Sequence, residues 1–427
     1  MMVFFAGDDR VHSQQVGGIC RAPVPPSEQG GAPSAGGGTF QLIPSICVSE
    51  RYDSNVFYRP PTPGLERDDF VTNVTPMLRV NHNGDYASGF MDMAGFAEIY
   101  AKNPDLNYLG TRNRLALILD NSIKRLFPNA SLRIDDTLSY TPLPPGFVNP
   151  VAGTSPSAPG NVQNIYAIGF LGARTNNVIN NGVVSMAYAT TPSTSIYASY
   201  SSAILRWLSS SSPQGVTTLF DTTTHTGSVG GNAEVSRVDT VTVNYAHSQI
   251  EFAPTSPSPS SPPASFTTDI ATVGWRRIFT TNLKAEVGGG GIWVDPGLTT
   301  YAANAALIMN IENNQATISY ARSAYPSYAS VPTVLISDTV SVSAIQKIDQ
   351  QWQVVERAYY SHSSGEAGVE RLTYDSYGGE VGIEYLITRI WSAALGYGYV
   401  NFDQRLGATK TQFDRHVGML SVRATWE

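Results

Sequence analysis

The feature that most constrains this chain is an alternation of apolar and polar residues that recurs from residue 40 to the C-terminus. In segment 390–402, Trp391, Leu395 and Tyr397 fall on one face, whereas Ser392 and Gly396 fall on the other. A period of two is typical of a β-strand with one apolar and one polar or small face. Each alternating segment covers about 10–15 residues, while strands of soluble sheets usually have about 5–6 residues and tilted membrane strands about 9–11. The alternation therefore predicts strands that cross a membrane.

The connections between these segments are of two kinds that alternate along the chain. Short ones lie at 81–85, 191–193 and 348–350, and long ones rich in Pro, Ser, Gly or Thr lie at 53–68 and 141–177. An outer-membrane barrel has short periplasmic turns and longer extracellular loops, whereas a soluble sandwich has no reason to keep this order. The sequence thus predicts an all-β fold, a transmembrane antiparallel up-and-down β-barrel.

Counting hairpins predicts about 18 strands, an even number that leaves both ends of the barrel on the periplasmic side. Sixteen is the alternative, because segment 222–234 is a poor strand and segment 164–174 competes for pairing. Asp136 and Asp338 fall on apolar faces, which indicates a bulge, a register error or a position at the extracellular end. The predicted strands are 40–52, 69–81, 85–101, 109–121, 128–140, 178–190, 194–207, 222–234, 238–251, 266–277, 281–294, 299–311, 315–325, 333–347, 351–362, 371–387, 390–402 and 412–426.

Charged residues are scarce in this chain. They make up 14% of the sequence, against about 25% in a typical soluble domain. A barrel explains the scarcity, since an Arg or Lys facing lipid at mid-depth costs about 2–4 kcal/mol. The net charge of -7, without a basic cluster, argues against nucleic acid as a partner.

The N-terminal segment differs in texture from the rest. Residues 1–39 are predicted to form a flexible leader rich in Gly and Pro, and residues 40–427 to form the barrel. The apolar run at the start is short and follows no basic residue, so it is at most the remnant of a secretory signal. Cys20 and Cys47 are the only cysteines, and their spacing leaves open whether they pair.

Several segments carry a resemblance to a known family. Segments 48–57 (VSERYDSNVF) and 69–76 (DFVTNVTP), with the hairpins at 188–199 and 385–397, resemble the outer-membrane β-barrel porin family often found beside exopolysaccharide gene clusters. The resemblance spans most of residues 40–427. It implies a barrel in the outer membrane of a Gram-negative bacterium, and the family has no defined catalytic residues to transfer.

The last strand suggests how the barrel is assembled. Residues 420–426 alternate apolar and polar residues and place Trp426 next to the C-terminus. Bacterial barrels usually close with such a strand, which the barrel-assembly machinery reads. The partners expected are therefore this machinery, outer-membrane lipid and lipopolysaccharide, and small hydrophilic solutes. A homo-oligomer or a periplasmic partner stays open.

The sequence gives little support for catalysis. It has six histidines but no H-E-x-x-H, G-x-S-x-G or P-loop spacing. His247 and Glu251 share a strand face and are weighed as a metal or acid–base pair, although polar residues near the extracellular rim are the simpler interpretation. Gly288 to Gly291 lack the Lys-Ser/Thr of a phosphate loop and indicate strong bending of the strand or close approach of another segment. We expect no enzyme, no metal and no cofactor.

The alternation also sorts side chains into a lumen set and a lipid set. Charges on the polar faces are candidates for a lumen that selects solutes: Arg79, Arg112, Arg114, Arg133, Arg423, Asp92, Glu98, Asp120, Asp135, Glu286, Glu380 and Glu384. They form either oppositely charged walls with a transverse field or an internal salt-bridge network. Aromatic residues on the apolar faces are candidates for interfacial girdles: Trp391, Tyr397, Tyr399, Tyr385, Trp293, Tyr301 and Trp426.

These features favour a porin-like channel for passive diffusion of ions or small hydrophilic solutes. A barrel of 16–18 strands leaves an aqueous channel unless something fills it. Two alternatives stay open: an exopolysaccharide-export barrel, which would have aromatic stacking platforms in its lumen, and a structural or interaction barrel plugged by loops or sheathing a partner protein.

Overall fold

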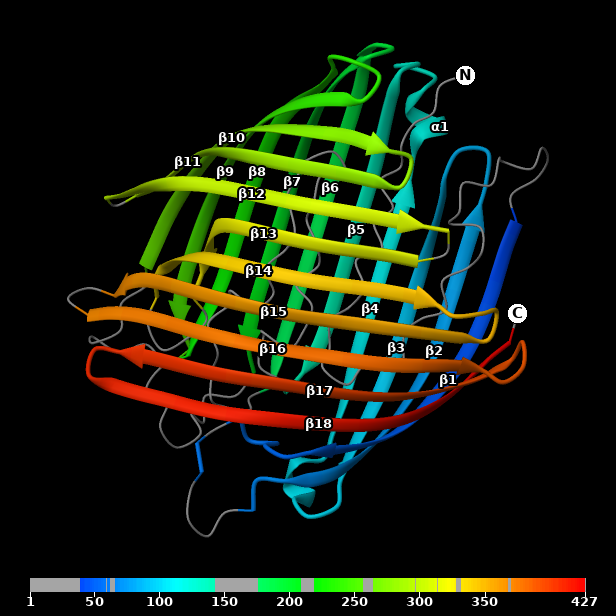
Figure 1. Cartoon of the computed structure of the whole chain (residues 1–427), viewed down its shortest axis with the longest axis vertical. Coiled ribbons are helices and arrows are strands. Elements are labelled where there is room, and N and C mark those ends of the chain that lie inside the picture. The colour runs from blue at the N-terminus through cyan, green and yellow to red at the C-terminus, as the bar shows by residue number, and fades with distance from the viewer. Residues whose placement is uncertain are drawn as a thin grey trace.

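The alternating segments form one antiparallel sheet that closes on itself, as Figure 1 shows for this computed structural model. The structure describes residues 39–58, 60–61, 66–142, 176–208, 219–255, 264–295, 297–312, 314–327, 332–367 and 370–426. Its strands are β1 (Thr39–Asp53), β2 (Asp69–Asn83), β3 (Ser88–Tyr100), β4 (Tyr108–Ile118), β5 (Ala130–Thr141), β6 (Asn177–Thr191), β7 (Thr194–Trp207), β8 (Phe220–Glu234), β9 (Asp239–Pro254), β10 (Ala264–Thr280), β11 (Leu283–Asp295), β12 (Leu298–Ile311), β13 (Asn314–Pro326), β14 (Val334–Lys347), β15 (Trp352–Ala367), β16 (Glu370–Leu386), β17 (Trp391–Leu406) and β18 (Thr409–Thr425).

The prediction of an up-and-down barrel of 18 strands is confirmed. Each strand pairs with its neighbours in sequence, and β18 pairs with β1 from Ser45 opposite Thr425 to Asp53 opposite Val417, which closes the barrel. The strand at 222–234 is real, since β8 pairs with both β7 and β9. The competing segment 164–174 and the leader 1–38 lie outside the described residues.

Helix is confined, in the described residues, to η2 (Pro104–Leu106) and α1 (Asp120–Ile123). No described helix is long and apolar enough to cross a membrane. The helix α1 corrects one prediction, because β4 ends at Ile118 and Asp120 begins the helical turn that follows it. Asp120 therefore does not lie on a strand. Its carboxylate accepts a hydrogen bond from the backbone of Leu132 at 3.0 Å.

The lengths of the connections follow the predicted order only in part. At the periplasmic end the connections have two to four residues, apart from the segment 119–129 that holds α1. At the opposite end the long connections 54–68, 142–176 and 208–219 stand beside short ones such as the two-residue turn 407–408. In Figure 1 the front strands β10–β18 cross the rear strands at an angle, as tilted barrel strands do.

The outer face of the barrel is apolar and the inner face carries polar residues, which is the opposite of the polar surface and apolar core of a soluble protein. Outward residues are apolar yet exposed, with exposed fractions of 60% for Leu395, 56% for Val273 and 55% for Leu420. The inward positions include polar and charged residues that are buried, among them Thr268, Arg415 and Ser421. An exposed apolar band around a closed barrel is the surface that lipid covers.

A belt of hydrogen-bonded polar and aromatic side chains, the upper girdle, marks one edge of this band. Its members face outward and pair across neighbouring strands: Tyr200 with His225, Tyr245 and His247 with Asp269, Tyr320 and Arg322 with Asp338, Tyr360 and His362 with Asp375, and Tyr397 with His416. Aromatic residues with a polar tip suit the boundary between lipid and water.

A second set of outward aromatic residues, the lower girdle, lies toward the periplasmic turns. It consists of Trp275, Phe279, Trp352, Tyr385, Trp391 and Trp426. On β16 the outward positions Tyr377 and Tyr385 are eight residues apart, about 26 Å along the strand. At a strand tilt of about 40° this is a height of about 20 Å, comparable with the apolar band of about 25 Å in outer-membrane barrels.

The upper girdle also explains the two acidic residues that the alternation places on apolar faces. Asp338 accepts hydrogen bonds from Arg322 and from the Tyr320 hydroxyl. Asp136 accepts a hydrogen bond from the Asn180 side chain at 3.1 Å. Both lie in regular register within the extracellular half of their strands, so the extracellular position is correct and neither a bulge nor a register error is needed.

The glycines of β11 allow close approach of the neighbouring strand, as predicted. A Cβ added at Gly290 would overlap the backbone oxygen of Ala271 on β10, whereas one at Gly289 would lie 3.7 Å from the nearest atom, the Ala302 oxygen. We expect Gly290→Ala to lower the free energy of unfolding by about 1–3 kcal/mol through overpacking, and Gly289→Ala to lower it by much less. Urea unfolding in lipid measures both, and equal losses would contradict this reading of β11.

Candidate functional site

The inner wall of the barrel gathers the charged residues that its strands contain. The register places Arg79 opposite Asp92 and Asp92 opposite Arg114, all inward. Every predicted lumen residue apart from Asp120 occupies an inward position of its strand. These are Arg79, Asp92, Glu98, Arg112, Arg114, Arg133, Asp135, Glu286, Glu380, Glu384 and Arg423. That they select solutes is a proposal.

Most of these charges form ion pairs between inward side chains. Arg79 donates to both carboxylate oxygens of Asp92 at 2.6 and 2.7 Å, and Arg133 donates to both oxygens of Asp135 at 2.5 and 3.0 Å. The remaining predicted acids also have arginine partners on the wall: Glu380 with Arg357, Glu384 with Arg423, and, at 3.9 Å, Glu286 with Arg276. The described wall is therefore largely a salt-bridge network.

A buried network at the closure of the barrel was missed from the sequence. Arg415 on β18 donates two hydrogen bonds to Asp53 on β1, at 2.9 and 2.5 Å. Arg51 donates to both oxygens of Glu98 on β3 at 3.2 and 3.0 Å. The Tyr100 hydroxyl donates to Glu98 at 2.7 Å. Arg51 and Asp53 occupy alternate positions at the end of a predicted strand, and this spacing was the available signal.

The extracellular end of the lumen is lined by apolar side chains. Inward Leu335, Leu372 and Phe413 pack around Tyr58, which comes from the segment after β1. The Arg415 guanidinium lies 4.7 Å from the Tyr58 ring centroid. A second cluster includes Phe252 and other inward residues of β8–β12. Tyr58 therefore packs against inward side chains of the wall and narrows the extracellular end of the lumen.

Two arginines differ from the rest of the wall. Among the described residues, neither Arg112 nor Arg114 has a salt-bridge partner. The Arg114 guanidinium instead lies 5.0 Å from the ring centroid of Phe90, and that of Arg79 lies 4.7 Å from it. The inner wall thus carries an excess of positive charge at one place on β4.

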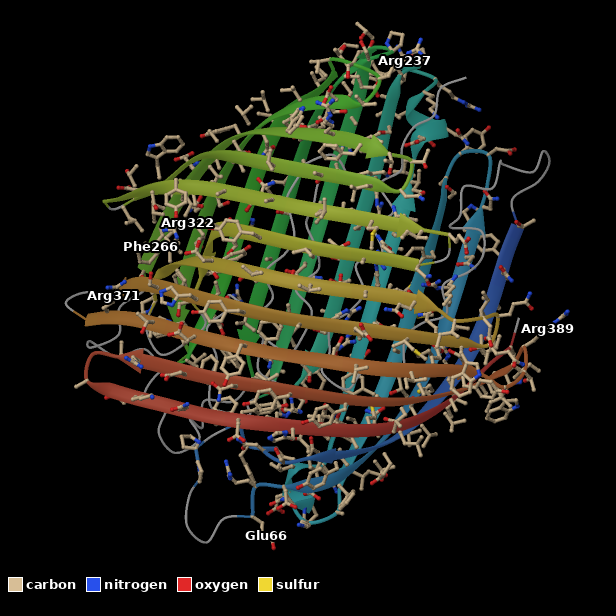
Figure 2. The ribbon with its side chains drawn as sticks, in the orientation of Figure 1. Glu66, Arg237, Phe266, Arg322, Arg371 and Arg389 are labelled. Atoms are coloured by element: carbon tan, nitrogen blue, oxygen red, sulfur yellow. The ribbon has the colours of Figure 1, made fainter. Side chains whose placement is uncertain are left out.

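The predicted girdle residues all lie on the outward face, on either side of the apolar band. Tyr397 belongs to the upper girdle, and Trp293 lies opposite Asp269 of the same belt. The Arg322 guanidinium lies 4.3 Å from the Tyr301 ring centroid, in the region labelled at the left of Figure 2. The remaining candidates are Tyr399, beside His416, and the lower-girdle residues Tyr385, Trp391 and Trp426.

The histidine–glutamate pair considered from the sequence has other partners in the structure, and one of the two cysteines is disulfide-bonded. His247 Nδ1 lies 2.9 Å from Asp269 and not against Glu251, which accepts a hydrogen bond from Gln249. The described residues contain no group of three metal-ligating side chains. Cys47 faces inward and is disulfide-bonded; Cys20 is the only other cysteine of the sequence and lies outside the described residues.

Comparison with known proteins finds similarity in structure but not in sequence. No family model and no curated protein matches this sequence, so the resemblance to the exopolysaccharide-associated family stays a prediction. The solved OpdK outer-membrane protein of Pseudomonas aeruginosa is similar, with a TM-score of 0.43 and 10% identity over 90% of this chain and 99% of that one. The siderophore receptor PirA of Acinetobacter baumannii has a TM-score of 0.42 and 7% identity over 90% and 80%. At these identities neither protein assigns a solute or a binding residue to this chain.

Proposed function

We propose that this protein is a porin-like channel through which ions or small hydrophilic solutes diffuse passively. The closed barrel, with its apolar belt and two girdles, is an outer-membrane protein of a Gram-negative bacterium. The observation that carries the proposal is the inner face, which is polar and charged along β1–β6 while the outer face is apolar. A barrel of this strand number encloses a lumen wide enough for water and solutes.

The export alternative has no specific observation in its favour. An exopolysaccharide barrel would use exposed aromatic rings as stacking platforms along the lumen. The inward rings of Phe252, Tyr374, Phe402 and Phe413 are instead buried in the apolar clusters near the extracellular end. We therefore retain the channel as the proposed function.

Planar lipid bilayers test the channel directly. The full chain, purified and shown to migrate as a folded, heat-modifiable barrel, is added to one side of the membrane. We expect stepwise, ohmic conductance that rises with salt concentration, because polar walls let hydrated ions pass. Liposomes containing the protein should swell in isotonic solutions of small neutral sugars. Folded, inserted protein that gives neither conductance nor swelling would overturn the proposal.

A further inference from the structure

The excess positive charge on β4 sits in a defined setting on the inner wall. In register, Arg112 lies between Ala94 on β3 and Ser139 on β5, and Arg114 lies between Asp92 and Thr137. The two arginines occupy successive inward positions of one strand, about 7 Å apart. Their guanidinium groups therefore share one side of the lumen.

The acidic neighbours of this pair are already occupied. Asp92, opposite Arg114, receives two hydrogen bonds from Arg79. Asp135, the next inward acid on β5, receives two from Arg133. Each of these acids is neutralised by its own arginine, so the charges of Arg112 and Arg114 remain uncompensated among the described residues.

An independent feature beside the arginines also lacks a partner. The Thr137 hydroxyl is buried and has no hydrogen-bond partner among the described residues. A buried polar atom left unsatisfied in a native structure calls for an explanation, and a bound water or ion is one of them. Ser139, buried at 7% exposure, places a second hydroxyl next to Arg112.

The shape of the site is fixed by its neighbours. The Phe90 ring lies between the guanidinium groups of Arg79 and Arg114, and such cation–π contact holds a guanidinium plane in place. An arginine held in this way keeps its N–H donors available for a planar or tetrahedral oxyanion, which it binds in a bidentate manner.

We propose that Arg112, Arg114, Thr137 and Ser139 form a binding site on the lumen wall for an oxyanion, a carboxylate or phosphate group carried by a small solute. Two cations and two hydroxyl donors without an acid match the charge and the several acceptor oxygens of such a group. The site deepens the proposed function, since it names the class of solute that the channel would favour.

The test compares a double variant with a matched control. Arg112→Gln/Arg114→Gln removes both charges of the site. Arg237→Gln/Arg389→Gln removes the same number of charges from two periplasmic turns, which Figure 2 labels away from the inner wall. Thr137→Val removes only the unsatisfied hydroxyl and keeps the shape of the side chain. Heat-modifiable migration shows that each variant is folded.

Binding is measured without any current, by calorimetric titration of the detergent-solubilised full chain with inorganic phosphate and, separately, with acetate. We expect saturable binding of at least one, weakened about tenfold or more in the double variant and less in Thr137→Val, because a hydrogen bond to a charged group is worth about 1.5–3 kcal/mol. The control should bind as the parent does. The two titrations decide between a phosphate and a carboxylate.

Reversal potentials in bilayers give the second readout. In gradients of potassium phosphate, acetate and chloride, the parent should prefer the bound oxyanion over chloride, and the double variant should lose that preference. No binding, or equal binding in parent and double variant, would overturn the site even if conductance is present. Binding without conductance would support the site and overturn the channel.

Discussion

Replacing Arg415 by methionine is expected to lower the free energy of unfolding by about 3–5 kcal/mol, the cost of removing the partner that hydrogen-bonds to both oxygens of the buried Asp53 carboxylate and of leaving only Arg51, at 3.8 Å, to balance it. Asp53 is 1% exposed and Arg415 is 2% exposed, and two hydrogen bonds join them. Because methionine fills much of the volume of arginine, the decrease in the free energy of unfolding comes from the lost charge and not from a cavity. Urea unfolding in lipid vesicles, followed by tryptophan fluorescence, measures the change.

The double variant Asp53→Asn/Arg415→Met supplies the control, because it removes both charges. We expect it to recover most of the loss, as is usual when a buried ion pair is replaced as a whole. If the double variant is as unstable as Arg415→Met alone, the pair does not act through charge. If Arg415→Met costs less than about 1 kcal/mol, the site is not desolvated.

The position of this pair explains why it should matter to the whole barrel. Arg415 comes from β18 and Asp53 from β1, the two strands whose pairing closes the sheet. Arg51, two residues before Asp53, carries the network on to Glu98 of β3. The first and last strands of the barrel are thus joined by side chains as well as by backbone hydrogen bonds. If these two strands separated, the barrel would open and expose two unpaired strand edges.

The strands themselves could be predicted because each has one face in lipid. A lipid-facing row must be apolar over the whole crossing, which gives long alternating runs such as 390–402, and β17 (Trp391–Leu406) contains all of that run except its first residue. The ends were less certain, since strands here continue past the upper girdle with polar residues on both faces. This is why β15 extends to Ala367 beyond its predicted end at 362.

The pairing of charges could not be predicted in the same way. Alternation puts Arg79, Asp92 and Arg114 on the inner wall, and the register places both arginines opposite the one carboxylate. Which arginine takes Asp92 depends on side-chain geometry: Arg79 donates to both of its oxygens, whereas the Arg114 guanidinium lies 5.0 Å from the Phe90 ring centroid. The sequence therefore indicates a charged wall, while the structure distinguishes its paired charges from the excess on β4.

Among the described residues, one outward carboxylate between the two girdles has no hydrogen-bond or ion-pair partner. Glu356 on β15 lies between the two girdles, opposite Ala344 and Val381. None of the described residues forms an ion pair with it.

The second large prediction concerns where lipid covers the outer face of the barrel. Val273 on β10 faces outward, four residues from Asp269 of the upper girdle and two from Trp275, the lower-girdle residue nearest to it on this strand. Ser265 lies on the same face of the same strand, four residues beyond Asp269. If lipid covers the band between the girdles, Val273→Arg should lower the free energy of unfolding in lipid by about 2–4 kcal/mol, and Ser265→Arg by about 0–1 kcal/mol.

Comparing Val273→Arg with Ser265→Arg tests only the depth of the charge in the membrane, because both variants place an arginine on the outward face of the same strand. Neither replaces a residue of the inner wall, so the ion pairs of the lumen stay intact. Urea unfolding of both variants in phospholipid vesicles gives the two costs. Equal costs would mean that the girdles do not bound the lipid, and a larger cost at Ser265 would shift the membrane toward the extracellular end. A much larger cost at Val273 than at Ser265 would place the outer boundary of the lipid at the upper girdle. The proposed oxyanion site on β4 and β5 would then lie within the membrane, on the lumen wall along which solutes pass.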